Sequence, residues 1–332
     1  MTTRRVSVAT LGGTITMTSP SPGAGAVPTQ SAQELLAATP ALAGLADLTV
    51  ETLSTKPGAS LRFGELLGVL DWGEQRVRQG ADGIVVVQGT DTLEESAYLL
   101  DLLWPHEEPL VLTGAMRTPG QASPDGSANM TAAIVAASDK ACRGLGAVVV
   151  INDEIHAARR VRKQDSIALG AFSSGVFGPL GRLHENRVTI ANHIQRAPIL
   201  RSPAHLDVAV TLLEATLGDQ GDVIRMLARS STVDGLVIAG LGAGHVSDSA
   251  AEAVTAAAAV MPVVLCSRTG GGPVLEATYG FPGSESDLIE RKAIPAGWLD
   301  ARKSRILLSL LLATGHRGDE IRKVFAVHGA AP

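Results

Sequence analysis

The chain has 332 residues, a length that favours two domains, and 45% of them are hydrophobic but only 3% aromatic, so Val, Leu, Ile and Ala must build the cores. The net charge is −5 and no long basic run occurs, which argues against nucleic acid as a partner, because phosphate binding needs clustered Lys and Arg. We find neither a signal-peptide core nor an apolar run long enough to cross a membrane, so we expect no membrane partner and a cytoplasmic location.

The first half of the chain alternates short apolar runs with helical patterns. Such a β-α repeat predicts a parallel, doubly wound sheet. Residues 19–27 are rich in Pro, Gly and Ser and predict a mobile loop that could act as a lid. Residues 152–200 are polar and broken by Gly and Pro, and we expect an extended, mixed region there. The predicted strands cover residues 6–10, 48–53, 84–87, 110–113 and 147–151, and the predicted helices cover 31–39, 63–78, 92–103 and 128–140.

The second half predicts a smaller α/β domain. We divide the chain into an N-terminal catalytic domain (1–197), a linker (198–212) and a C-terminal domain (213–332). The predicted strands of the C-terminal part cover residues 208–213, 235–238 and 262–265, and its predicted helices cover 222–229, 249–259, 301–313 and 319–325.

No pattern in the chain predicts a metal or redox site. Cys142 and Cys266 lie far apart in sequence and are interpreted as reduced thiols. The eight histidines are scattered, and His156 and His184 are interpreted as surface or core residues rather than ligands. A glycine-rich run at 240–244 is similar to a dinucleotide-binding loop, but no acidic residue follows a strand at the usual distance.

The stretch from Ile84 to Glu95 organises the first domain. Four apolar residues in a row predict a strand buried on both faces, and Gly89 permits a sharp turn or a close approach to a ligand. Thr92 and Glu95 fit a capping box, which predicts a helix beginning at once. The intervening turn, with Thr90 and Asp91, is where ligands bind in an open α/β sheet. A role limited to capping the helix is an equally good interpretation of this stretch alone.

Thr14 and Thr90 each follow a predicted strand and adjoin glycine. The run 114–117 supplies a third strand-end turn, and in a parallel sheet all three turns lie at one edge. Such an edge could gather a hydroxyl nucleophile, a second hydroxyl and backbone donors around one carbonyl group. A hydroxyl nucleophile needs a base, and Lys163, oriented by Asp91, could serve if it is desolvated or crowded by cations.

Several of these segments together resemble the bacterial-type L-asparaginase family. They are Leu-Gly-Gly-Thr-Ile at 11–15, Gln-Gly-Thr-Asp-Thr at 88–92, Thr-Gly-Ala-Met-Arg at 113–117 and the segment around Lys163, and the likeness continues in family order through 177–181 and 297–305. The resemblance implies hydrolysis of the side-chain amide of asparagine, and often of glutamine, with release of ammonia and without metal or organic cofactor.

The resemblance also implies roles for individual residues. Thr14 is the expected nucleophile, and Thr90, Asp91 and Lys163 form the expected second group, which activates the attacking hydroxyl or water. Backbone N–H groups near Thr90 and Ala115 are the expected oxyanion donors.

The implied substrate contacts come from both domains. Asp91 and Gly89 would hold the amino-acid end of the substrate together with the turn Gly58-Ala59-Ser60, which would bind its α-carboxylate. His245 stands where many family members carry Asn and is a further candidate. The family also implies a homotetramer, or a homodimer, with sites shared between copies.

The chain departs from the family pattern at three places. Leu11 stands where Thr is usual, residues 19–29 contain no Tyr, and Ala59 and Ser60 stand where Ser followed by Gln or Asp is usual. Two alternatives therefore remain beside an asparaginase: a related enzyme for a larger amide, and a non-catalytic protein that binds an amino acid.

Overall fold

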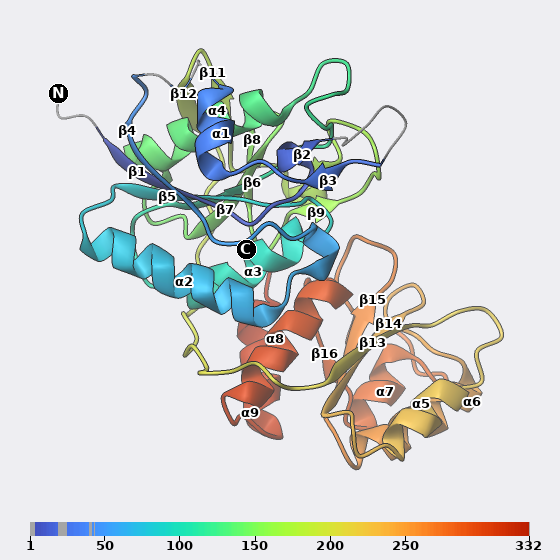
Figure 1. The fold of residues 1–332 in the computed structure, drawn as a ribbon. Helices are drawn as coiled ribbons and strands as arrows, with labels where there is room; N and C mark the ends of the chain where they lie inside the picture. The colour runs from blue at the N-terminus through green and yellow to red at the C-terminus, as the bar shows by residue number, and fades with distance from the viewer. Residues whose placement is uncertain (1–3, 19–24, 40–41, 43, 332) are drawn as a thin grey trace. The chain divides into compact units, whose positions relative to one another are not determined.

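The computed structural model describes residues 4–18, 25–39, 42 and 44–331 (Figure 1). Within the chain, Met1–Leu200 and Arg201–Pro332 form two compact units, each considered by itself below. No helix among the described residues has the length and apolar character that a membrane span requires.

The first unit is built on an eight-stranded sheet. Its order is β12-β11-β8-β7-β6-β5-β1-β4, with five parallel strands at one side and three antiparallel strands at the other. The parallel strands are β1 (Arg5–Thr10), β4 (Asp47–Thr52), β5 (Gly83–Val87), β6 (Leu110–Thr113) and β7 (Ala147–Ile151), and the antiparallel strands are β8 (Glu154–Ala157), β11 (Gly181–His184) and β12 (Arg187–Ile190).

Helices cover both faces of this sheet (Figure 1). The helices α1 (Ala32–Ala37) and α4 (Gly126–Ser138) pack on one face, and α2 (Phe63–Arg78) and α3 (Leu93–Leu103) pack on the other. All five residues of β5 are fully buried because both of its faces are covered. The predicted doubly wound, mainly parallel sheet is therefore confirmed.

The strand order reverses between β1 and β5. After β1 the chain forms β4 on one side of it and then β5 on the other side. Thr10 at the end of β1 pairs with Val87 at the end of β5, so these two strands end side by side. In open α/β sheets the crevice outside such a reversal is the usual ligand site. The turns that carry Thr14 and Thr90 follow these two strand ends.

Short elements complete the first unit. The expected lid at 19–27 lies mostly outside the described residues, because 19–24 are not described, and Val27 belongs to a two-residue strand. The expected mixed region contains the hairpin β9–β10, which carries Lys163. The short elements are β2 (Met17–Thr18), β3 (Val27–Pro28), β9 (Arg162–Lys163), β10 (Phe172–Ser173), η1 (Thr14–Thr16), η3 (Gly58–Ser60), η4 (Lys140–Cys142) and η5 (Gly175–Phe177).

The second unit is a smaller α/β layer around a four-stranded parallel sheet, which confirms the predicted C-terminal fold. Its order is β13-β14-β15-β16. The strands are β13 (Val210–Glu214), β14 (Gly235–Gly240), β15 (Val263–Ser267) and β16 (Ile294–Pro295), and the helices are α5 (Asp222–Ala228), α6 (Asp248–Ala258), α7 (Glu285–Glu290), α8 (Ala301–Ala313) and α9 (Asp319–His328).

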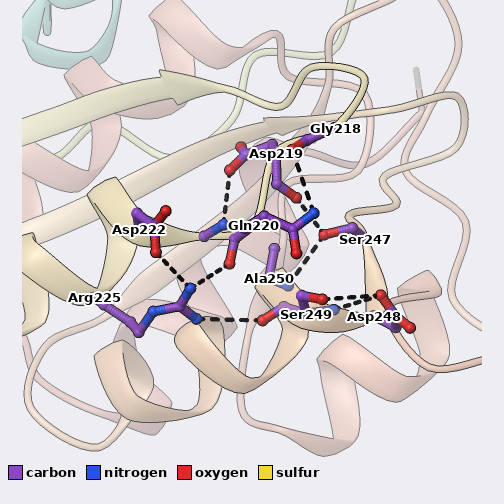
Figure 2. Close-up of polar contacts among 10 residues, drawn as sticks. Gly218, Asp219, Gln220, Asp222, Arg225, Ser247, Asp248, Ser249 and Ala250 are labelled. Carbon is purple, nitrogen blue, oxygen red and sulfur yellow. Dashed lines mark hydrogen bonds and ion pairs between the residues drawn. The ribbon is translucent and has the colours of Figure 1, made fainter.

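Polar contacts join the loops that follow β13 and β14 (Figure 2). The Ser247 hydroxyl donates to the Asp219 carbonyl at 2.5 Å. The Arg225 guanidinium donates to the Gln220 carbonyl at 2.6 Å and to the Ser249 carbonyl at 3.4 Å. These contacts fix the segment after β14, which includes His245, against the neighbouring loop.

Two glycines in this region allow a matched test of packing. Gly218 and Gly221 both have positive φ, 83° and 78°, but a Cβ on Gly221 would lie 2.8 Å from Ala250 Cα, whereas a Cβ on Gly218 would have no neighbour within 4 Å. We expect Gly218→Ala to lower the free energy of unfolding by about 1–2 kcal/mol through backbone strain alone. Gly221→Ala should cost about 1–3 kcal/mol more through steric overlap. Urea denaturation of both variants measures the difference, and equal losses would contradict the packing.

Candidate active site

Lys163 lies between Thr90 and Asp91. Its Nζ is 2.9 Å from Thr90 Oγ1 and 3.0 Å from Asp91 Oδ1, so the contact predicted from the sequence is present. Thr90 is 4% exposed and the Lys163 side chain 16%, whereas the Asp91 side chain is 67% exposed. A buried hydroxyl, a largely buried lysine side chain and an open carboxylate therefore form one chain of polar contacts.

Glu94 fixes the backbone that carries Lys163. It lies in the first turn of α3, is 1% exposed, and its carboxylate accepts a hydrogen bond from the backbone N–H of Lys163. The segment that carries the Lys163 side chain is thereby tied to the helix that begins just after Thr90. Sequence reasoning missed this residue. The available signal was an acidic side chain in the first turn of a helix that is otherwise mostly apolar.

His156 holds the same hairpin from another side. It is buried on β8, and its Nδ1 lies 2.9 Å from the hydroxyl of Ser174, the residue after β10. Burial lowers the pKa of His156 to about 4, with a smaller contribution from Arg182, so the ring is neutral at pH 7. The structure thus confirms His156 as a core residue.

Thr14 follows β1 at the edge of the sheet. Gly12 and Gly13, with φ of 98° and 89°, turn the chain sharply, and the half-buried Thr14 begins η1. The Thr14 hydroxyl makes no hydrogen bond within the described part of the chain. Leu11, where the family usually carries Thr, is 1% exposed and its N–H donates to the Val87 carbonyl at 2.8 Å. The Leu11 side chain therefore belongs to the packing beneath the turn.

Three glycines bring three turns into backbone contact. A Cβ on Gly13 would lie 2.1 Å from Gly89 N, and a Cβ on Gly89 would lie 2.8 Å from Gly58 N. Only residues without side chains allow these backbones to approach so closely. The contact places the turn with Thr14, the turn with Thr90 and the start of the 58–60 turn against one another.

The predicted capping box at Thr92 and Glu95 is wrong. The helix does begin at Leu93, but the Thr92 side chain makes no capping hydrogen bond. Its hydroxyl instead donates to the Gly58 carbonyl at 3.0 Å. The glycine contact brings that carbonyl within reach, and the hydroxyl then ties the 58–60 turn to the start of α3.

Two backbone N–H groups remain unused at the strand ends. Neither Thr90 N nor Ala115 N donates a hydrogen bond to another residue that the structure describes. Ala115 is fully buried, and a Cβ on the preceding Gly114 would lie 2.5 Å from the Gln88 carbonyl oxygen, so the turn after β6 packs on the turn after β5. Free N–H groups at such an edge can bind a negatively charged oxygen.

The remaining candidates divide between the two units. Gly58 is buried, while Ala59 and Ser60 are exposed on η3 in the first unit. His245 belongs to the second unit, where its Nε2 lies 3.0 Å from Glu285 Oε2 and its ring packs edge-on against Tyr279 at 5.0 Å and Phe281 at 5.2 Å. The structure thus brings the other candidates together in the first unit and places His245 in the second.

The two cysteines are buried free thiols, and burial raises the pKa of both Cys142 and Cys266 to about 12. Residues 4–18, 25–39, 42 and 44–331 contain no group of three or more His, Cys, Asp and Glu side chains placed to hold a metal ion.

A doubly wound sheet with hydroxyls, a lysine and unused N–H groups at its switch point has the architecture of an α/β enzyme. Comparison with known proteins narrows the class. The family model "Asparaginase, N-terminal" matches residues 5–196, and "Glutaminase/Asparaginase C-terminal domain" matches residues 209–325. These matches cover most of the chain, which therefore belongs to the asparaginase family of amidohydrolases, as the sequence resemblance predicted.

Individual relatives agree with the family assignment. The chain is 39% identical over 254 residues to a "Probable L-asparaginase" of Deinococcus radiodurans, covering 76% of this chain and 77% of the relative. It is 33% identical over 264 residues to an L-asparaginase of Bacillus licheniformis, covering 79% of this chain and 81% of the relative. The crystal structure of a probable cytoplasmic L-asparaginase from Campylobacter jejuni superposes on this chain with a TM-score of 0.86 at 28% sequence identity. The superposition covers 98% of this chain and 99% of the other.

The glycine contact predicts how the site responds to one added methyl group. Gly89→Ala should push the turns with Gly13 and Gly58 apart. Because misplacement by about 1 Å can cost about 10²-fold in rate, we expect amide turnover to fall by at least that factor. Gly68→Ala, on an exposed position of α2 with no neighbour within 4 Å, is the matched control and should leave turnover unchanged. Turnover by Gly89→Ala within twofold of the wild type would contradict the role of the contact.

Proposed function

We propose that this protein hydrolyses the side-chain amide of L-asparagine, and also of L-glutamine, with Thr14 as the nucleophile. The observation that carries the proposal is the contact of Lys163 Nζ with both Thr90 Oγ1 and Asp91 Oδ1, at the sheet edge where Thr14 lies. The family of the chain supports the same reaction. The function that the sequence resemblance implied is therefore the one we propose.

The proposed reaction has two steps that use protein groups only. Thr14 Oγ adds to the amide carbon, its proton passes through the Thr90 hydroxyl to the neutral amine form of Lys163, and the N–H groups of Thr90 and Ala115 receive the oxyanion. Collapse of this adduct breaks the C–N bond, and the leaving nitrogen takes up the proton and departs as ammonia. Water, activated by the same second group, then hydrolyses the ester on Thr14 and releases the acid.

The substrate is held by groups around this centre. The exposed carboxylate of Asp91 suits the α-amino group, and Gly89 allows the substrate to approach the backbone. The turn Gly58-Ala59-Ser60 suits the α-carboxylate. We also propose a homotetramer or homodimer in which His245 contributes to a shared site, and a cytoplasmic location. We retain 1–197 as the catalytic domain, 198–212 as the linker and 213–332 as the smaller domain.

A larger amide is a second candidate substrate. Ala59 is exposed and offers no hydroxyl where the family usually carries Ser, so the α-carboxylate loses one donor and the turn gains space. A substrate whose α-carboxylate is itself part of an amide would tolerate this loss. The non-catalytic alternative is less favoured, because the Thr90–Lys163–Asp91 contacts are complete.

Ammonia release from asparagine, glutamine and dipeptide amides tests the function. We expect wild-type turnover on at least asparagine, and Thr14→Ala should abolish it because the proposed ester forms on the Thr14 hydroxyl. Thr131→Ala is the control, since the Thr131 hydroxyl donates to its own helix at the Ser127 carbonyl, 2.9 Å away. Failure to release ammonia from any amide, with saturable binding of an amino acid, would favour the non-catalytic alternative. A strong preference for dipeptide amides would favour the second candidate.

Lys163→Met tests the proton relay. Loss of a positioned proton-transfer group typically costs about 10²–10⁴-fold in rate, so we expect kcat to fall by that factor with little change in thermal stability. Lys140→Met removes an exposed lysine on η4 and should change kcat by less than about twofold. If Lys163→Met keeps near-full activity, the second catalytic group is not the one proposed.

A further inference from the structure

The turn after β6 exchanges hydrogen bonds with two polar side chains at the N-terminal end of α4, one at the N-cap and one within the helix. This turn, residues 114–117, contains Ala115, whose N–H is a proposed oxyanion donor. The carboxylate of Asp125 accepts hydrogen bonds from Met116 N at 2.9 Å and from Arg117 N at 2.9 Å. Both N–H groups that follow Ala115 are thereby fixed, while the Ala115 N–H itself donates to no residue within the described ranges.

Asn129 completes this arrangement from the next turn of the helix. It is 3% exposed, and its Nδ2 donates to the Gly114 carbonyl and to Asp125 Oδ2, each at 2.9 Å. Its Oδ1 accepts from Asn152 N at 2.9 Å. Asn129 therefore ties the β6 turn, the start of α4 and the β7–β8 turn together in a buried position.

The arrangement departs from ordinary helix capping. Asp125 occupies the N-cap of α4, where an Asp side chain usually accepts a hydrogen bond from a backbone N–H of the first turn, yet its carboxylate accepts none from the described backbone of α4. Its carboxylate turns back to the strand-end turn instead. Forgoing a cap costs about 1 kcal/mol of stability, and departures of this kind are expected where local structure serves a site.

We propose that Asp125 and Asn129 are positioning residues that set the direction of the Ala115 N–H, an inference that rests on the proposed function. The Gly114 carbonyl, which accepts from Asn129, belongs to the same planar peptide unit as the Ala115 N–H, and the Met116 N–H, which donates to Asp125, belongs to the next unit. With both fixed by a rigid helix, the turn cannot rotate, and the Ala115 N–H stays directed at the crevice. A preorganised donor of this kind stabilises charge without reorganisation in the transition state.

The test uses Asn129→Asp and Asp125→Asn in the full chain. Each variant keeps the size of the side chain. Asn129→Asp removes the donor to the Gly114 carbonyl, and Asp125→Asn replaces one of the two carboxylate oxygens that accept from the turn by a donor. We expect kcat on the best amide to fall about 10- to 100-fold, as for a donor misplaced by a fraction of an ångström to 1 Å. The dissociation constant of L-aspartate should change by less than about twofold, because the other turns hold the amino-acid end. Asn192→Asp is the control, since Asn192 donates to the Phe177 carbonyl at 2.8 Å, away from the turn.

Hydrogen exchange of the peptide spanning 113–117 provides a readout that does not depend on turnover. We expect at least tenfold faster exchange in both variants, with the exchange of α2 unchanged, which also shows that the variants are folded. Unchanged exchange, or an equal loss of kcat and of aspartate binding, would overturn the positioning role. Absence of amide turnover in the wild type would overturn the proposed function, while the exchange data would still decide whether these residues hold the turn.

Discussion

The backbone contact among Gly13, Gly89 and Gly58 is the constraint on which the candidate site depends. The parallel sheet brings the ends of β1 and β5 to one edge, but alignment of strands leaves several ångströms between neighbouring turns. The glycines close that distance, since a single Cβ at Gly13 would overlap Gly89. A nucleophile on one turn and a second hydroxyl on the next can then serve the same carbonyl group.

Polar side chains then fix the orientation of the backbone segments that carry Lys163 and Ala115 at the same edge of the sheet. Glu94 fixes the backbone of Lys163, and Asp125 with Asn129 fixes the turn that contains Ala115. All of these contacts join a side chain in a helix or at its N-cap to the backbone of a strand end or hairpin. Hydrogen bonds in such surroundings are strong and costly to break, so the reactive groups keep their directions before a substrate binds.

The alternating sheet and helix pattern predicted most of the fold, because fully buried strands such as β5 and amphipathic helices such as α2 have clear periodicity. The strands β9 and β16 have two residues each and carry no periodic signal, so they could not be predicted. Thr90, Asp91 and Lys163 were identified from motifs and are in contact. The bond from Thr92 to Gly58 and the role of Glu94 depend on residues far apart in sequence, and local rules such as capping gave the wrong partner for Thr92.

A crystal structure with bound L-aspartate, the product of the proposed reaction, tests the central claim most directly. The account predicts the α-carboxylate at the turn 58–60 and the α-amino group at Asp91. The side-chain carboxylate should lie within about 3.5 Å of Thr14 Oγ, a near-attack separation, with one oxygen accepting from Thr90 N and Ala115 N. Aspartate bound elsewhere, or bound with its side chain directed away from Thr14, would contradict it.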